Sequence, residues 1–213
     1  MSILLGQKNQ LWWDIPAQDS YAMLASIYDL DEQTTRARVN ELAALLDCTH
    51  VLDVQLRRLS LGERMKMELI GSLLHKPKVL FLDEPTIGLD VLAQATIRGF
   101  LIEYVKSEKP TIILTSHSMD DIAQLADRLL LMSQGEIVYD GRVQAFVNRA
   151  KPKQKISALL QNQRTVSQEV PVSEIGTFVS ELVKESPLLE LKIEEPNFED
   201  VIREFLAQNQ NIR

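Results

Sequence analysis

The sequence contains only one cysteine, Cys48, among its 213 residues. A single cysteine cannot build an internal disulfide framework, which excludes the small secreted domains that such frameworks hold together. This composition suits a protein of the reducing cytoplasm. Cys48 follows the apolar residues 42–46, so we expect it to be a small core residue and not a reactive thiol.

The sequence also lacks a long apolar segment and an excess of positive charge. No stretch approaches about eighteen consecutive apolar residues, so we expect no membrane-spanning helix. The formal net charge of -7 argues against nucleic acid as a partner, because nucleic-acid binders usually present a broad basic face. The first residues, MSILLGQK, carry neither a basic leader nor a long apolar stretch, and we expect no signal peptide.

A third absence concerns a glycine pattern. A self-sufficient phosphate-binding loop requires Gly-x-x-x-x-Gly-Lys-[Ser/Thr], whose backbone amides cradle the phosphates of a nucleotide. The sequence has 8 glycines, and none is followed by lysine and then serine or threonine. The principal cradle for β- and γ-phosphates is therefore absent from this chain.

The apolar periodicity predicts a helical region and then a parallel sheet. A short strand at residues 3–5 precedes a region, residues 16–46, in which apolar side chains recur at helical spacing. The continuous apolar run at residues 79–82 predicts a strand buried on both faces. A helix over residues 91–105 then leads to a second apolar run at residues 112–114. This strand–helix–strand order implies neighbouring parallel strands with a right-handed crossover.

The pattern changes in the last third of the chain. We expect a further helix, a hairpin around Ser133-Gln134-Gly135, and a linker at Lys151-Pro152-Lys153. We therefore predict a main domain over residues 1–150 and a small α+β appendage over residues 151–213. The elements expected from the hairpin onward are strands at residues 128–132, 136–139, 156–160 and 188–193 and helices at residues 175–183 and 199–207.

Paired acids follow the first buried run of the expected sheet. Asp83 and Glu84 come directly after residues 79–82, and ligands of open parallel sheets bind beyond the carboxyl ends of the strands. One carboxylate can hold Mg²⁺ through its waters, and the second can orient or deprotonate an attacking water. The alternative is that acids stand there because the chain has reached solvent, and the pair alone does not decide between these interpretations.

His117 stands just past the second buried run, after Thr115-Ser116. If the two strands are neighbours, His117 opens onto the same sheet edge as the acids, where it could touch a γ-phosphate. As an isolated histidine, it fits an ordinary loop residue better. We interpret His75 as a helix-end histidine and assign no partner to His50.

A capping box is expected at Ser60-Leu61-Gly62-Glu63. Ser60 can accept a hydrogen bond from the Glu63 amide, and the Glu63 side chain can reach back to Ser60. The following helix would present backbone amides and partial positive charge, which suit a phosphate. Capping boxes are common and most bind nothing, so the segment is weak evidence by itself.

Taken in order, these pieces resemble the ATP-binding subunit of ABC transporters. The resemblance covers about residues 3–145, and four ordered matches carry it. A C-terminal stretch, EEPNFEDVI at residues 194–202, is similar to the tail of ABC-2 type, drug-exporter-like ATPases. The four matches are Gln7 (Q-loop), LSLGER at residues 59–64 (signature segment), VLFLDEPTIGLD at residues 79–90 (Walker B through D-loop) and TSH at residues 115–117 (switch histidine).

The resemblance implies a fold, cofactors and roles for the residues of one nucleotide site. The fold would be α/β, a P-loop NTPase-like parallel sheet core with a helical subdomain at about residues 12–58, incomplete at the N-terminus. The cofactors would be ATP and Mg²⁺. Asp83 would bind Mg²⁺ indirectly, and Glu84 would polarise the hydrolytic water. Gln7 would sense the γ-phosphate and Mg²⁺, and His117 would contact the γ-phosphate.

The resemblance also implies partners. Ser60, Gly62 and Glu63 would close over ATP bound to a second ATPase subunit in a head-to-tail dimer, with Asp90 at that interface. The helical subdomain would face transmembrane permease subunits and hold the chain at the inner face of the cell membrane. Trp12 and Trp13 fit either that docking surface or ordinary packing.

The sequence departs from the family in its signature segment and in its N-terminal part. Leu61 replaces the usual glycine and Glu63 the common glutamine. The chain lacks the N-terminal region of the family, which carries the phosphate-binding loop and the residue that stacks on adenine. We expect a fragment in preference to a degenerate subunit, and a chain that does not hydrolyse ATP alone. The alternative is a non-catalytic module that supplies the signature segment to an intact subunit.

Overall fold

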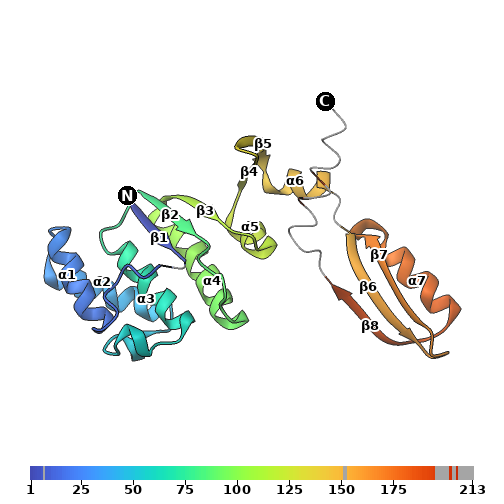
Figure 1. The fold of residues 1–213 in the computed structure, drawn as a ribbon, viewed down its shortest axis with the longest axis horizontal. Helices are drawn as coiled ribbons and strands as arrows, with labels where there is room; N and C mark the ends of the chain where they lie inside the picture. The colour runs from blue at the N-terminus through green and yellow to red at the C-terminus, as the bar shows by residue number, and fades with distance from the viewer. Residues whose placement is uncertain (7, 151–152, 195–201, 203–204, 206–213) are drawn as a thin grey trace. The chain divides into compact units, whose positions relative to one another are not determined.

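The computed structural model describes residues 1–6, 8–150, 153–194, 202 and 205, with no side-chain description for residues 147–150. The chain divides into two compact units, Met1–Ser116 and His117–Arg213. Figure 1 labels the elements of both units. No helix in the described part of the chain is long and apolar enough to span a membrane.

The first unit contains a parallel sheet of three strands (Figure 1). β1 (Ser2–Leu5), β2 (Val79–Asp83) and β3 (Thr111–Thr115) lie in the order β1-β2-β3. The helix α4 (Val91–Glu108) connects β2 to β3. These findings confirm the predicted neighbouring parallel strands. The last residues of the strands are in register, Leu5 opposite Asp83 and Asp83 opposite Thr115.

The sheet is buried on one face within this unit, which corrects the prediction that residues 79–82 are buried on both faces. Leu80 and Leu82 are buried, whereas Phe81 is only half-buried. Its register neighbours on β1 and β3 are Ile3 and Ile113, which are 48% and 50% exposed. The physical reason is topological. Both connections step across the sheet in one direction, so right-handed crossovers place their helices on the same face.

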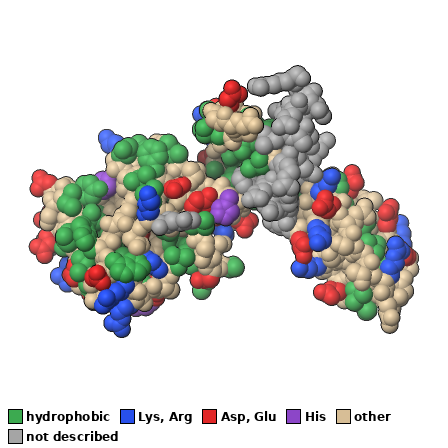
Figure 2. Space-filling model, in the orientation of Figure 1, with side chains coloured by type: hydrophobic (Ala, Val, Ile, Leu, Met, Phe, Trp, Pro, Cys, Tyr) green, Lys and Arg blue, Asp and Glu red, His purple; other side chains and the backbone are tan. Residues whose placement is uncertain are grey.

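The helical part of the first unit precedes β2. It comprises α1 (Ala17–Ile27), α2 (Glu32–Leu45) and α3 (Leu61–Leu73), and α3 packs on β1 and α4. Asp31 caps α2 by accepting a hydrogen bond from the Thr34 amide. Cys48 is buried, as expected of a core residue. Large apolar side chains such as Met23, Ile27 and Leu45 stay exposed, and Figure 2 shows hydrophobic side chains on the surface of this unit.

The second unit begins with a short helix and a hairpin. α5 (Met119–Leu125) leads to the antiparallel strands β4 (Arg128–Ser133) and β5 (Glu136–Arg142), followed by α6 (Val143–Ala150). Gln134 and Gly135 have φ angles of 51° and 82°, which suit a two-residue turn whose twist matches that of the strands. The hairpin prediction is therefore confirmed. A small core of Leu131, Phe146 and Phe205 lies beside it.

The remainder of the second unit is a three-stranded antiparallel sheet with one helix. β6 (Lys153–Leu160) lies between β7 (Thr165–Pro171) and β8 (Leu188–Glu194), and Leu182 of α7 (Ile175–Glu185) packs on Ala158 and Leu160. The sequence predicted β6, β8 and α7 but not β7. Most of the helix predicted at residues 199–207 lies outside the described residues. The domain division at residue 150 stays a prediction.

Candidate functional site

The ends of the three parallel strands are tied together around Asp83. The Thr115 hydroxyl donates a hydrogen bond of 2.6 Å to Asp83 Oδ1. The Gly6 amide donates to the Asp83 carbonyl at 2.8 Å, and the Glu84 amide donates to the Thr115 carbonyl at 3.0 Å. Asp83 is exposed at this edge. The structure therefore holds one carboxylate in a defined direction at the carboxyl end of the sheet.

Glu84 adopts an uncommon backbone conformation directly after this carboxylate. Its φ angle is 51°, in the left-handed region that costs a non-glycine residue about 1 kcal/mol or more. Gly6 allows the close approach of the neighbouring chain, because a Cβ at residue 6 would lie 2.4 Å from the Glu84 carbonyl oxygen. Strain of this kind persists where the surroundings enforce it, and it clusters at functional sites.

Two residues of this edge, Thr115 and Gly6, were not predicted as site residues from the sequence. Thr115 belongs to the TSH match but was assigned no role of its own, although its place at the end of a predicted strand was a usable signal. Gly6 has no signal beyond standing before Gln7. Gln7 itself lies outside the described residues. His117 opens the second unit, two residues after Thr115.

The predicted capping box is confirmed at the start of α3. Ser60 accepts a hydrogen bond from the Glu63 amide at 3.3 Å, and Glu63 Oε2 accepts from the Ser60 amide at 2.9 Å and from its hydroxyl at 2.7 Å. These bonds from Ser60 hold the pKa of Glu63 below its ordinary value, with a smaller contribution from His50. His50, which had no partner in the sequence analysis, lies 3.8 Å from Glu63 Oε1.

The structure brings the signature segment (residues 59–64) beside the turn that ends at Asp90. Asp90 caps α4 by accepting a hydrogen bond of 2.9 Å from the Ala93 amide. A Cβ at Gly62 would lie 3.0 Å from the Ala93 Cβ, so the two helix starts pack closely. Gly88, with a φ angle of 70°, packs near Leu61. Two sequence motifs about thirty residues apart therefore form one surface.

The residues present fit a magnesium ion that a nucleotide helps to hold. The described residues contain no group of three or more His, Cys, Asp or Glu that could enclose a metal ion. Mg²⁺ usually keeps several waters and takes one or two carboxylates plus substrate phosphates. The single oriented carboxylate of Asp83 suits that mode of binding and not a cage formed entirely by protein.

Comparisons with known proteins give this geometry a family context. A family model described as "AAA domain, putative AbiEii toxin, Type IV TA system" matches residues 31–120. The chain is 27% identical over 146 residues to the ABC transporter ATP-binding protein NatA of Bacillus subtilis, covering 68% of this chain and 59% of NatA. It is 40% identical over 98 residues to the energy-coupling factor transporter ATP-binding protein EcfA2 of Clostridium perfringens, covering 46% of this chain and 34% of EcfA2. Its homologues are ATP-binding proteins of ABC transporters.

The solved structure of cbiO1 from Clostridium perfringens, part of the ABC transporter complex cbiONQ, resembles this chain. The TM-score is 0.62 at 28% sequence identity, covering 69% of this chain and 59% of cbiO1. This likeness confirms the predicted P-loop NTPase-like α/β fold, to which a C-terminal sheet is added. The chain spans between about a third and three fifths of the length of these relatives.

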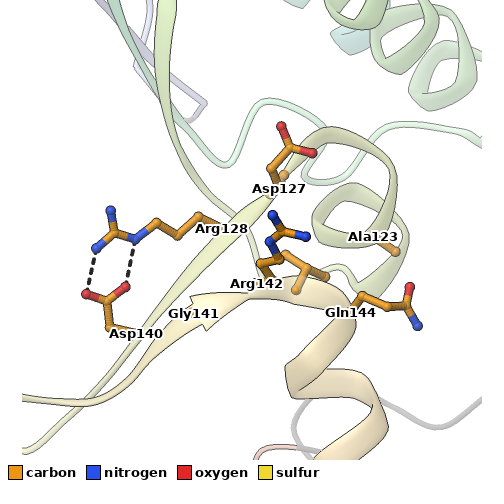
Figure 3. Close-up of a pocket in the computed structure, with 9 residues that line it drawn as sticks. Ala123, Asp127, Arg128, Asp140, Gly141, Arg142 and Gln144 are labelled. Carbon is orange, nitrogen blue, oxygen red and sulfur yellow. Dashed lines mark hydrogen bonds and ion pairs between the residues drawn. The ribbon is translucent and has the colours of Figure 1, made fainter.

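A separate pocket of about 920 Å³ lies in the second unit of the chain (Figure 3). Its lining includes Arg128 and Asp140, whose side chains form two hydrogen bonds of 2.7 Å each. This pairing lowers the pKa of Asp140 and raises that of Arg128. None of the residues predicted for the nucleotide site lines this pocket.

Proposed function

We propose that this chain is the ATP-binding subunit of an ABC-type transporter, or a part of one, and that its parent protein couples ATP hydrolysis to transmembrane transport. The observation that carries this proposal is the strand-end cluster. Asp83 is oriented by Thr115, and Glu84 follows in a strained turn at the carboxyl end of a parallel sheet. Two acids in this place suit phosphoryl transfer to water.

The residues take separate parts in this chemistry. Asp83 would hold Mg²⁺ through its waters, and the ion would neutralise charge on the phosphates. Glu84 polarises the attacking water, and Gln7 senses the γ-phosphate and the ion. His117 contacts the γ-phosphate and stabilises charge that develops on it.

We further propose that the chain does not hydrolyse ATP alone. It carries no Gly-x-x-x-x-Gly-Lys-[Ser/Thr] loop, so nothing in it presents a γ-phosphate to Glu84. In the first unit the sheet face with Ile3 and Ile113 is open. Parallel sheets are usually covered on both faces, and this face leaves room for further polypeptide that would carry the missing loop.

The proposed partners follow from two surfaces of the first unit. Ser60, Gly62 and Glu63 present a helix start to ATP on a second ATPase subunit in a head-to-tail dimer, with Asp90 beside them. The helical region at about residues 12–58 faces transmembrane permease subunits at the inner face of the cell membrane. Trp12 and Trp13 are each 40% exposed there.

Measuring phosphate release from ATP tests this function. The isolated chain is compared with a completed chain, in which a segment from an ABC ATP-binding relative that carries Gly-x-x-x-x-Gly-Lys-[Ser/Thr] precedes Met1. We expect no Glu84-dependent hydrolysis by the isolated chain. The completed chain should hydrolyse ATP, and Glu84→Gln should slow it about 10²–10⁴-fold.

The matched control is Glu103→Gln, which changes an exposed glutamate of α4 and should leave the rate unchanged. Hydrolysis by the isolated chain that Glu84→Gln abolishes would refute the proposed inactivity. If Glu84→Gln does not slow hydrolysis by the completed chain, the proposed role of Glu84 is refuted.

A second candidate function is a non-catalytic module that supplies the signature segment to an intact subunit. The observation in its favour is that the cap at Ser60 and Glu63 is fully formed within the first unit. Capture of the cbiO1 relative by the immobilised chain tests it. ATP should strengthen capture, and Ser60→Arg should abolish the ATP effect. Ser107→Arg, at the exposed end of α4, is the control, and capture that is equal with and without ATP would exclude this candidate.

A further inference from the structure

A buried carboxylate in α3 binds backbone amides that lie far away in the sequence. Glu68 is 4% exposed. It accepts hydrogen bonds from the Gln10 amide at 3.0 and 3.1 Å and from the Leu11 amide at 3.2 Å. Burial raises the pKa of Glu68, and the bonds from Leu11 and Gln10 oppose that rise. In the described part of the chain Glu68 forms no ion pair, so these amides are its main compensation for burial.

The same face of α3 contacts the neighbouring residues 10–13 at two further points. The Arg64 guanidinium lies 4.7 Å from the centre of the Trp13 ring. Leu11 packs so closely on Gly71 that a Cβ there would lie 3.0 Å from Leu11 Cδ2. Residues 64, 68 and 71 share one helix face, because their spacings of four and three residues match the helical repeat. The contact is therefore continuous over about two helical turns.

Gly6 and the side chain of Gln10 form hydrogen bonds with the sheet. The Gly6 amide donates to the Asp83 carbonyl at 2.8 Å, and the Gln10 side chain donates to the Ile3 carbonyl at 2.9 Å. Gly6 is therefore anchored beside Asp83, and the backbone amides of Gln10 and Leu11 are anchored on α3. α3 itself begins at the capping box of Ser60 and Glu63.

We propose that Glu68 is a positioning residue that couples the backbone at Gln10 and Leu11 to the signature segment, so that a displacement of one is transmitted to the other. The functional meaning of this coupling rests on the proposed function, because only under that function do the residues next to Gln7 and the signature segment belong to nucleotide sites. The coupling itself is a property of the first unit. It needs no nucleotide, partner or hydrolysis in order to be measured.

The experiment uses amide NMR of the full chain. Glu68→Gln replaces one acceptor oxygen with an NH₂ group that faces amide donors, so the bonds cannot all be kept. We expect hydrogen exchange at Gln10 and Leu11 to accelerate at least about tenfold, with the amides of β2 unchanged. Glu103→Gln, an exposed change on α4, should alter neither.

A second measurement separates coupling from mere local stability. Gln10→Ala removes the side-chain bond to Ile3 but keeps the amide that binds Glu68. We expect it to shift the amide signals of Gly62 and Glu63 in the otherwise unchanged chain, and Glu68→Gln to reduce these shifts at least about twofold. Equal shifts with and without Glu68→Gln would overturn the proposal, even if exchange at Gln10 accelerates.

A milder variant covers the case in which Glu68→Gln does not fold. Arg64→Met removes the contact with Trp13 and leaves the buried carboxylate in place. The response of Gly62 to Gln10→Ala should then also fall, and an undiminished response would count against the coupling. Failure of the proposed function is recognised separately, by the absence of Glu84-dependent hydrolysis in the completed chain.

Discussion

Thr115 donates a hydrogen bond of 2.6 Å from its hydroxyl to a carboxylate oxygen of Asp83. Each residue ends its strand, and the two are opposite one another in the parallel register of β2 and β3. The bond therefore fixes the direction of the Asp83 carboxylate at the sheet edge. Under the proposed function, this pair would hold the carboxylate in place for the waters of a magnesium ion that the nucleotide helps to bind.

Replacing this hydroxyl should cost stability as well as ion binding. Thr115→Val keeps the shape of the side chain but removes the donor to Asp83, and we expect a loss of about 1 kcal/mol in the free energy of unfolding. Urea unfolding followed by circular dichroism measures it. Thr111→Val, at the exposed first position of the same strand, is the control. An equal loss in both variants would show that the bond contributes nothing.

The cap at Asp90 gives a second prediction. Asp90→Ala removes the acceptor for the Ala93 amide at the start of α4, and we expect it to lower the free energy of unfolding by about 1 kcal/mol. Asp90→Ser supplies another capping oxygen and should restore most of this loss. The same unfolding assay applies. If serine performs no better than alanine, the contribution of Asp90 does not come from capping.

His75 should make the first unit sensitive to acid. Its ring stacks on Tyr28 at 4.1 Å between centroids, its Nε2 faces the Met1 carbonyl, and its buried Nδ1 has no partner among the described residues. Burial lowers the pKa of His75. A depressed histidine pKa favours the neutral ring in the folded state.

The sign of the pH dependence follows from this pKa. The stabilising contribution is fully present above the unfolded pKa of about 6.5, and it is lost as pH falls through the lower folded pKa. Between pH 7 and pH 5 the free energy of unfolding should therefore fall more in the unchanged chain than in His75→Phe, which keeps the stacked ring. Urea unfolding at the two pH values measures both slopes. Parallel slopes would rule out a role for His75.

Cys48 should react slowly in the folded chain. It is buried, and this burial raises the pKa of the thiol to about 11. At pH 8 the thiolate is then only about a thousandth of the total, and the thiolate is the reactive form. We expect a disulfide reagent to label the native chain at least about a hundredfold more slowly than the chain in urea. Labelling at equal rates would contradict the core position.

The sequence predicted the elements whose signals are local. The apolar runs predicted β2 and β3. The capping box was predictable because it depends on two residues only three positions apart, Ser60 and Glu63. β7 was missed because Ser167, Gln168 and Glu169 make it largely polar, with little alternation to detect. An apolar run also cannot reveal which strand face a helix will cover, so the burial of Phe81 was predicted wrongly.

Contacts between distant residues were beyond a sequence analysis. Glu68 binds amides 57 and 58 residues away, and a glutamate within an amphipathic helix looks like an ordinary solvent-facing residue. The contact of 3.8 Å between His50 and Glu63 also joins residues that are distant in the sequence, so it could not be predicted either. The roles assigned to the site residues in nucleotide binding and hydrolysis, those of Asp83 and Glu84 included, stay predictions.

The most direct test of the central claim is paramagnetic broadening by Mn²⁺ in the completed chain. Glu84→Gln would slow hydrolysis, and Mn²⁺ would replace Mg²⁺ in the presence of ATP. We expect the ion to broaden the amide signals of Asp83 and Thr115 and the imidazole signals of His117, and Asp83→Asn to weaken all three effects. Broadening that spares His117, or that persists unchanged in Asp83→Asn, would contradict the assignment of one nucleotide site to these strand ends.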